Sequence, residues 1–125
     1  MAAPSIEEKL ATCHCGAVTL SLAAWPTEVT ECNCSLCRSY GVIWAYCSAS
    51  DILREPDPSL TDTYAWNGRN VDFHRCRNCG CVTHWLPRKS GRDRRGVNAR
   101  LLPTRNLGAA RVRHRDGAGT GEYLD

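Results

Sequence analysis

Large apolar side chains are scarce in this sequence. Leu, Val, Ile and Phe together account for 22 of the 125 residues, with one Phe, and there is one Met. Such scarcity is typical of disordered chains when the net charge is large, but here the net charge is only +3. A chain of this length buries roughly two-thirds of its unfolded surface, so a core this poor in aliphatic residues gives limited stability. We therefore expect one folded domain over residues 1–125, stabilised partly by something other than its core.

Two kinds of hydrophobic segment are also missing. No apolar run approaches the roughly 20 residues of a membrane span. Residues 1–10 are polar and include Glu7, Glu8 and Lys9, unlike a secretory signal. The sequence therefore predicts a cytoplasmic protein with no membrane partner, and residues 1–9 are expected to be flexible.

Cysteine, in contrast, is abundant. Nine is an odd number, so a closed disulfide framework would leave one thiol unpaired. Most of the cysteines are bunched at spacings of two or three residues, where a bridge between neighbours is strained, whereas such bunching suits thiolates that share a metal ion. A reduced, zinc-holding domain is the interpretation that fits. The bunches are Cys13 and Cys15; Cys32, Cys34 and Cys37; and Cys76, Cys79 and Cys81.

The first expected metal site joins Cys13–Gly16 (CHCG) to Cys76–Gly80 (CRNCG). Four thiolates supplied as two close pairs complete the tetrahedral shell of a structural zinc. A glycine after each pair fits a tight knuckle turn whose backbone N–H groups point at sulfur. Zinc binding of roughly 10–16 kcal/mol would add the stability that the core lacks. A thioredoxin-like redox pair at Cys76 and Cys79 is the alternative, but it needs a βαβ context that the sequence does not show.

The second expected site lies in Cys32–Arg38 (CNCSLCR). Three thiolates within six residues can hold one face of a zinc ion and leave its fourth position to an exchangeable ligand, the layout of a catalytic zinc. Three thiolates give the ion a net negative charge, which suits binding a further thiol better than activating water. The alternative is a second structural site closed by Cys47, Cys81 or His84. Spacing alone leaves both possibilities open.

Basic residues are concentrated in one stretch. Residues 88–115 hold ten of the sixteen Lys and Arg residues and one acid, Asp93. The stretch could form an anion or nucleic-acid site, or a solvated arginine-rich surface. It contains no Phe, Trp or Tyr to stack on bases, so we favour the solvated surface and expect no nucleic-acid partner.

Short strand patterns separated by turns make up most of the chain. Alternating apolar residues, β-branched runs and the Asn67-Gly68 turn signal predict short strands and hairpins. A mobile loop is expected at residues 89–95, short helices near residues 34–39 and 103–109, and inward side chains at Val97, Ala99 and Leu101. The fold class is therefore all-β, with short antiparallel strands and hairpins held by zinc knuckles. The strands are expected at residues 17–22, 28–31, 41–47, 63–66, 71–75, 82–86 and 96–102.

Taken in order, these motifs resemble the glutathione-dependent formaldehyde-activating family, whose relatives include centromere-protein-V-like zinc proteins. The resemblance covers residues 10–120 and also rests on Gly96–Arg100 (GVNAR) and Asp116–Ala118 (DGA). It implies a β-tent fold with one structural and one catalytic zinc. It also implies that glutathione and formaldehyde are joined as S-hydroxymethylglutathione, a carbon–sulfur lyase reaction run in reverse. The implied structural ligands are Cys13, Cys15, Cys76 and Cys79, and the implied catalytic ligands are Cys32, Cys34 and Cys37.

Residues near the second site are candidates for substrate contacts. Arg38 directly follows the cysteines, and its guanidinium suits one of the two carboxylates of glutathione. Trp44 and Tyr46 could line a pocket, although aromatic residues on strands more often belong to a core. Cys81 is expected to be a buried thiol, and His14 to be exposed.

Three hypotheses for function follow. The favoured one is a zinc-dependent carbon–sulfur lyase acting on a glutathione–aldehyde adduct. The others are an enzyme acting on a different thiol adduct, and a non-catalytic zinc module that binds protein or nucleic acid. An open metal position in a concave pocket favours an enzyme. A filled fourth position, with basic residues gathered on one face, favours the binding module. The oligomeric state does not follow from the sequence.

Overall fold

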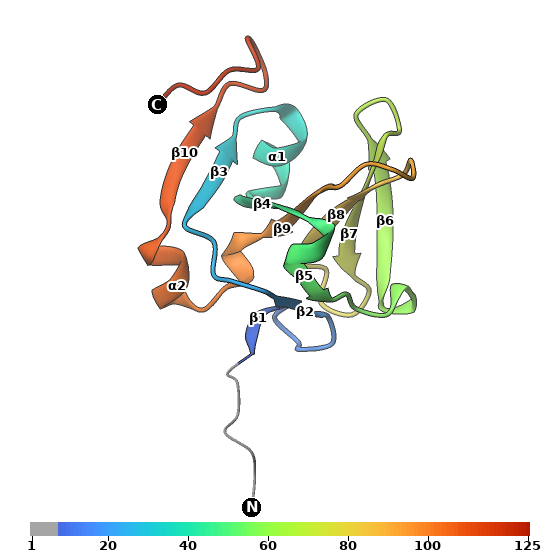
Figure 1. The fold of residues 1–125 in the computed structure, drawn as a ribbon. Coiled ribbons are helices and arrows are strands. Elements are labelled where there is room, and N and C mark those ends of the chain that lie inside the picture. Colours follow the sequence, from blue (N-terminus) through green and yellow to red (C-terminus); the bar gives the residue numbers. More distant parts are fainter. Residues whose placement is uncertain (1–7) are drawn as a thin grey trace, which may run out of the picture.

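Short strands connected by turns make up residues 8–125, the part of the chain that this computed structural model describes (Figure 1). Residues 1–9 were expected to be flexible. Of these, residues 1–7 lie outside the described part of the chain, and Lys9 begins the first strand. No helix among the described residues is long and apolar enough to cross a membrane. The strands are β1 (Lys9–Thr12), β2 (Thr19–Leu22), β3 (Glu28–Cys32), β4 (Trp44–Ser48), β5 (Ile52–Arg54), β6 (Thr61–Trp66), β7 (Val71–Cys76), β8 (Val82–Pro87), β9 (Arg94–Asn98) and β10 (Arg111–Arg115). The helices are α1 (Ser35–Tyr40) and α2 (Thr104–Ala109), and 3-10 turns lie at Ala49–Asp51, Pro58–Leu60 and Ala99–Leu101.

The strands form two sheets. The smaller has the order β1-β2-β5 and is antiparallel, and the larger has the order β10-β3-β4-β9-β8-β7-β6. Within the larger sheet β10 pairs parallel to β3, with Arg111 opposite Glu28, and the other pairs are antiparallel. The all-β class and the antiparallel hairpins are therefore confirmed, whereas the parallel pair was not expected. A parallel pair needs a long connection rather than a hairpin, and the chain between β3 and β10 provides one.

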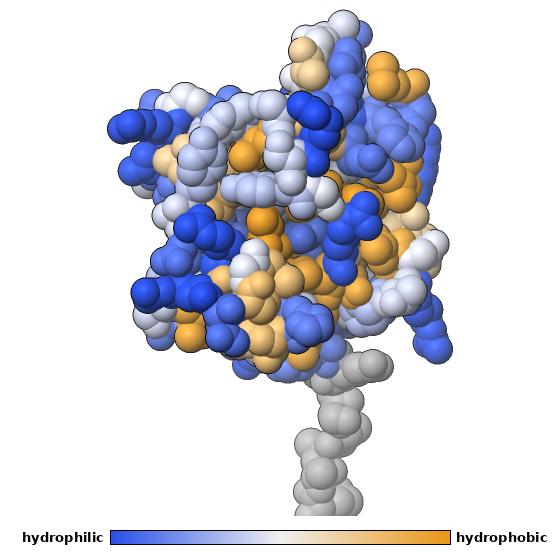
Figure 2. Space-filling view, turned by 180° about the vertical axis from the view of Figure 1, so that it is seen from behind, coloured by the Kyte–Doolittle hydropathy of each residue, from blue (hydrophilic) through white to orange (hydrophobic). Residues whose placement is uncertain are grey.

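The two faces of the larger sheet pack against different partners. Ala45 and Val97 belong to the main core, together with Leu20, Leu22 and Ile52 from the smaller sheet. Trp44 and Tyr46, their neighbours in β4, belong instead to an aromatic cluster beneath α1. This division follows from the alternation of side chains along a strand. Seen from behind, apolar residues show in the middle of a face framed by hydrophilic ones (Figure 2).

Most of the expected elements are present. The β6–β7 hairpin turns over Asn67-Gly68, and β7 and β8 pair as the arms of a second hairpin. Val97 and Ala99 are buried as expected, and Leu101 packs half-buried against the main core. The regular alternation stops where β9 ends at Asn98 and a 3-10 turn begins, and Leu102, 5% exposed, is also buried there. Sequence patterning also missed β1, β5 and β10, which are short strands at sheet edges.

Candidate functional site: two cysteine clusters and a cavity

The first cluster brings together Cys13, Cys15, Cys76 and Cys79, the four side chains that the sequence grouped. Their sulfur atoms all lie within 4.8 Å of one another, and Cys15 Sγ is 3.6 Å from Cys76 Sγ. One pair comes from the β1–β2 turn and the other from the β7–β8 turn, at the lower end of Figure 1. The cluster therefore connects the smaller sheet to the larger one.

Two glycines shape the turns that carry these cysteines. Gly16 has φ 85° and Gly80 has φ 81°, a left-handed conformation that strains residues with a side chain. In the first turn the N–H of Val18 donates to Cys13 Sγ at 3.2 Å. In the second turn the N–H of Gly80 donates to the carbonyl oxygen of Cys76 at 2.9 Å. The expected knuckle turns are therefore present.

The thiols of the first cluster differ in acidity. Backbone N–H groups of Cys81 and Cys15 lower the pKa of Cys79 to about 5, whereas burial raises the pKa of Cys13 to about 11. Cys79 therefore ionises readily, and the thiolate is the form that binds metal. Cys81 lies partly buried against the cluster but is not a member of the group of four, and His14 is exposed, as expected.

The second cluster consists of Cys32 at the end of β3, Cys34 just before α1, and Cys37 within the helix. Cys34 Sγ accepts a hydrogen bond from the N–H of Cys37 at 3.4 Å and so caps α1. The indole N–H of Trp44 donates to Cys37 Sγ at 3.3 Å. Burial raises the pKa of Cys37 to about 12, so its thiolate needs a nearby positive charge, such as a metal ion.

A C-terminal turn covers the second cluster. The side-chain NH2 of Asn33 donates to Asp116 Oδ1 at 2.9 Å, and Asn33 Oδ1 accepts from the N–H of Ala118 at 2.9 Å. A Cβ atom at position 117 would overlap Cys32 Sγ, so only glycine fits there. The DGA motif of the sequence therefore closes over the cysteines.

Within residues 8–125 the second cluster has three members. Cys47 packs against the main core, and Cys81 lies against the first cluster. His84 is buried on β8, where its ring stacks on that of His74 with centroids 4.3 Å apart and its Nδ1 lies 2.8 Å from Thr83 Oγ1. None of the three residues suggested to close the second site joins it. The three-thiolate arrangement is the one that the structure shows.

A cavity of about 590 Å³ opens over the second cluster, and we call it the cysteine cavity. Trp44 and Tyr46 line it, as the sequence suggested they could. Arg94 and Arg115 are its cationic residues, and among the described residues that line it there is no Asp or Glu. The cavity is therefore aromatic, positively charged and floored by sulfur. Its lining consists of Cys32, Cys34, Cys37, Trp44, Tyr46, Trp66, Asn67, Val71, Phe73, Trp85, Arg94, Arg115, Gly117, Gly121 and Tyr123.

The arginines of the cavity are not the one that the sequence singled out. Arg38 is exposed on α1 and is not among the lining residues. The guanidinium of Arg94 stacks on the ring of Tyr46 at 4.3 Å from its centroid, and Arg115 Nε donates to the carbonyl oxygen of Gly121 at 3.0 Å. The structure therefore brings Arg94 and Arg115, rather than Arg38, to the wall of the cavity.

Residues 9–107 match the family model of the glutathione-dependent formaldehyde-activating enzyme. The chain belongs to this family. A Rhodobacter sphaeroides protein of known crystal structure is 33% identical to it and has a similar fold, with a TM-score of 0.63. That likeness spans 82% of this chain and 98% of the other. The resemblance drawn from the cysteine motifs is confirmed, and the matched segment contains all seven cysteines of the two clusters.

Both clusters of this family member have donor sets that fit zinc. Four thiolates match a closed tetrahedral shell, and three leave one position for an exchangeable ligand. Every donor in the two groups is a cysteine sulfur, and soft thiolates select zinc over magnesium or calcium. The clusters could therefore hold a metal ion such as zinc.

Sequence reasoning missed several cavity residues of this glutathione-dependent formaldehyde-activating family member. Phe73 and Trp85 lie opposite each other across β7 and β8, so they share a face of the sheet. Phe73 lies between polar Asp72 and His74, and that alternation was a usable signal. For Arg94 and Arg115, the signal was the arginine-rich stretch 88–115, but composition does not show which of its members reach the cavity.

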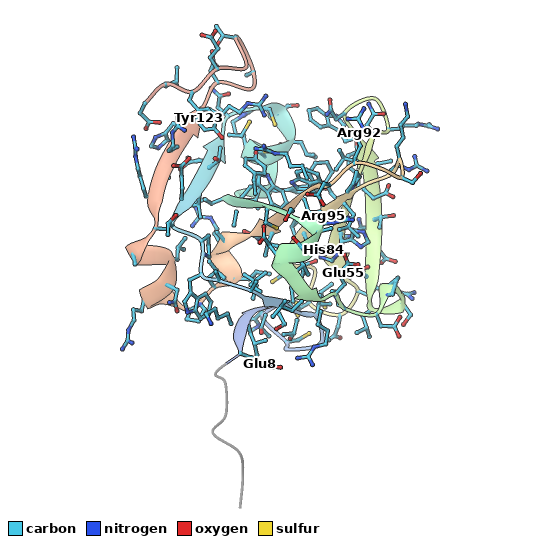
Figure 3. The ribbon with its side chains drawn as sticks, viewed as in Figure 1. Glu8, Glu55, His84, Arg92, Arg95 and Tyr123 are labelled. Atoms are coloured by element: carbon cyan, nitrogen blue, oxygen red, sulfur yellow. The ribbon has the colours of Figure 1, made fainter. Side chains whose placement is uncertain are left out.

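The basic residues of that stretch do not form a single patch. Figure 3 shows Arg92 in the β8–β9 loop, far across the molecule from Tyr123 beside β10. Arg113 pairs with Glu28 at 3.2 Å and stacks on Tyr123 at 3.9 Å, while Arg100 donates to the carbonyl oxygen of Gly41 at 2.6 Å. Several of these arginines therefore stabilise the fold or line the cavity, whereas the sequence favoured a solvated surface for the whole stretch.

Proposed function

We propose that this chain joins glutathione to formaldehyde as S-hydroxymethylglutathione in the cysteine cavity, with zinc in both clusters. The reaction is that of a carbon–sulfur lyase run in reverse. The observation that carries the proposal is the three-cysteine cluster at the floor of a cavity with two arginines and no acid in its described lining. Membership of the glutathione-dependent formaldehyde-activating family supports the choice of substrates.

The charge of the cavity complements glutathione. Glutathione carries two carboxylates and one ammonium group, and a guanidinium binds a carboxylate through two parallel hydrogen bonds. Arg94 is held in place by the Tyr46 ring, and Arg115 by its bond to Gly121. We therefore assign the two carboxylates to Arg94 and Arg115. Arg38, exposed on α1 outside the lining, serves as the comparison arginine.

A zinc ion in the three-cysteine cluster would hold the glutathione thiol as a thiolate, which is the nucleophile for the carbon of formaldehyde. Burial raises the pKa of Tyr46 to about 12, so its hydroxyl stays protonated at neutral pH. As the sulfur electron pair forms the C–S bond, the carbonyl π pair moves to oxygen, and that oxygen takes a proton from water in place of the one that the thiol released. The Tyr46 hydroxyl can donate a hydrogen bond to this oxygen as its charge develops.

All nine cysteines are free in this structure, which is the state that metal binding requires. Reducing conditions that keep thiols free are those of the cytoplasm. We therefore place the reaction there.

Calorimetry with glutathione and zinc-loaded protein tests the binding half of the proposal. Arg115→Ala is expected to weaken glutathione by about 1–2 kcal/mol, roughly tenfold, because it removes a charge-assisted contact at an exposed site. Arg38→Ala is the matched control and is expected to leave the affinity within about twofold. Affinity should also rise from pH 6 to pH 8 as the thiol ionises. No heat of binding to a protein that carries two zinc ions per chain would contradict the proposal.

The chemical half is tested by following labelled formaldehyde with NMR. The wild-type protein should accelerate adduct formation above the rate in buffer, and Cys34→Ser should not, because it removes one of the three thiolates. A folded, zinc-loaded wild type that binds glutathione but gives no acceleration would replace the enzyme with a binding module.

A further inference from the structure

A second cavity lies where the larger sheet splits. β3 and β4 pair only at Thr30 and Trp44, whereas β4 and β9 pair over five residues. Figure 1 shows β3 and β10 on one side of this contact and β4 and β9 on the other. A cavity of about 490 Å³ occupies the gap, and we call it the strand-gap cavity. Its volume is within the range of small-molecule sites.

The strand-gap cavity shares a wall with the cysteine cavity. Tyr46, Arg94 and Tyr123 line both. The hydroxyl of Tyr123 lies 2.9 Å from Thr30 Oγ1, within hydrogen-bond distance. Arg94 is exposed, and its guanidinium stacks on the Tyr46 ring. The two cavities therefore meet at these three side chains.

The two cavities differ in charge. The strand-gap cavity is lined by apolar Leu22, Trp25 and Val97, and to the shared Arg94 it adds the acids Glu28 and Asp51. Hydrogen bonds from Ser48 lower the pKa of Asp51, so it is ionised. These acids disfavour the carboxylate arms of glutathione here, whereas the arginines of the cysteine cavity attract them. The group that suits the strand-gap cavity is neutral and apolar.

We propose that the strand-gap cavity takes the hydrocarbon chain of an aliphatic aldehyde larger than formaldehyde, such as hexanal, while glutathione occupies the cysteine cavity. This inference rests on the proposed function. The reaction is the same thiol addition: the thiol releases its proton, the C–S bond forms, the carbonyl π pair moves to oxygen and the oxygen takes a proton from water. Only the substituent on the carbonyl carbon differs, and it points past Tyr46 into the gap between β3 and β4.

Calorimetry with two thioethers of glutathione tests this inference on zinc-loaded protein. S-hexylglutathione should bind at least about tenfold more tightly than S-methylglutathione, because its chain leaves water for an apolar cavity. Ala24 is exposed and lines the strand-gap cavity only. Ala24→Trp should fill the cavity and bring the ratio of the two affinities close to one. Ala109→Trp, on exposed α2 away from both linings, is the matched control and should keep the tenfold ratio.

Three results would overturn the inference. Equal affinities of the two thioethers for the wild type would show that the chain gains nothing. A hexyl preference that persists in Ala24→Trp would place the chain elsewhere, for instance on the aromatic residues of the cysteine cavity. A loss of glutathione affinity in Ala24→Trp equal to the loss of S-hexylglutathione affinity would place an arm of glutathione in the gap. In each case glutathione still binds the wild type, whereas failure of the proposed function is marked by no glutathione binding at all.

Discussion

The two cysteine clusters of this chain differ in how far apart their members lie in the sequence. The four-cysteine cluster joins residues 13–15 to residues 76–79 and ties the smaller sheet to the larger. The three-cysteine cluster draws its members from residues 32–37 and lies beside α1, at the other end of the molecule (Figure 1). A metal ion in the first would close a long loop, while an ion in the second would close almost none.

This difference separates stability from reactivity. Closing a long loop removes much of the conformational freedom of the unfolded chain, so the first cluster is placed to stabilise the fold. The second cluster adds little of this kind, but its sulfur atoms face a cavity. Ligands that are close in sequence occupy one side of an ion and leave the other side to a substrate.

The largest expected effect separates the two clusters by mutation. Cys79→Ser should prevent stable folding, because it removes a ligand from a zinc site expected to contribute roughly 10 kcal/mol or more. Cys34→Ser should give a folded protein with one zinc ion fewer per chain. The measurements are thermal unfolding and zinc content by mass spectrometry. Cys81→Ser is the control, since Cys81 adjoins the first cluster without belonging to it, and both zinc ions should remain. Equal unfolding by Cys79→Ser and Cys34→Ser would erase the proposed division.

A smaller effect is expected at the turn that covers the second cluster. Gly117→Ala would push a methyl group against Cys32 Sγ, and overpacking of this kind costs about 1–3 kcal/mol. Zinc affinity of the second site should therefore fall by roughly ten- to a hundredfold, while the first site keeps its ion. Competition with a chromogenic chelator measures both sites. Gly108→Ala, in α2 with open space around it, is the control and should change neither. Loss of both ions together would contradict the independence of the sites.

Acid should weaken the hairpin that carries Cys76 and Cys79. Burial, together with the charge of neighbouring His74, lowers the pKa of His84 to about 3, so only the unfolded chain takes up a proton near pH 6.5. The contribution of neutral His84 to the free energy of unfolding is present above pH 6.5 and is lost as the pH falls toward 3. The loss is about 2 kcal/mol between pH 7 and pH 5. Urea unfolding of wild type and His84→Gln should show this as a difference in pH slope.

His114 should show the opposite dependence of stability on pH. The hydrogen bond to Asp125 raises the pKa of His114, so its contribution is present at low pH and is lost as the pH rises. His114→Gln should therefore cost more stability at pH 5 than at pH 7. If His84→Gln and His114→Gln gave the same slope, the stacked pair would have no role in acid sensitivity.

The smallest expected effect concerns the donor to Cys37. Trp44→Phe removes the indole N–H that lies 3.3 Å from Cys37 Sγ and keeps most of the packing. Loss of one such hydrogen bond costs about 1 kcal/mol, so zinc affinity of the second site should fall by roughly fivefold. Trp85→Phe, also in the cavity, is the matched control. An unchanged zinc affinity in Trp44→Phe would mean that this hydrogen bond does not support the site.

The cysteine groups were predictable from the sequence because spacing alone decides which thiolates can meet. The glycines at 16 and 80 were predictable for a similar local reason, since a knuckle turn requires positive φ. Arg94 and Arg115 were not predictable in this way. Arg115 reaches the cavity because β10 lies parallel to β3 with Arg115 opposite Cys32. That register is set by a connection of many residues, which leaves no periodic trace in β10 itself.

The aromatic wall shows the same limit. Phe73 and Trp85 share a face only because the β7–β8 register shifts between His74 and Arg75, just before the cysteine turn. A shift of one residue would turn every side chain of a strand to the opposite face. Leu101 is only half-buried against the main core, because a 3-10 turn ends the alternation of β9 before it. Local spacing is visible in a sequence, whereas register between distant strands is not.

The C-terminal turn gives the chain two separable parts. The match to the family model ends at residue 107, whereas Arg115, Gly117, Gly121 and Tyr123 line the cysteine cavity. Asn33 holds this turn through two hydrogen bonds. Exchange of the last ten residues between family members would therefore alter the shape and charge of the cavity while leaving the seven clustered cysteines untouched. Positions of this tail other than Gly117 are therefore the place to alter substrate preference by design.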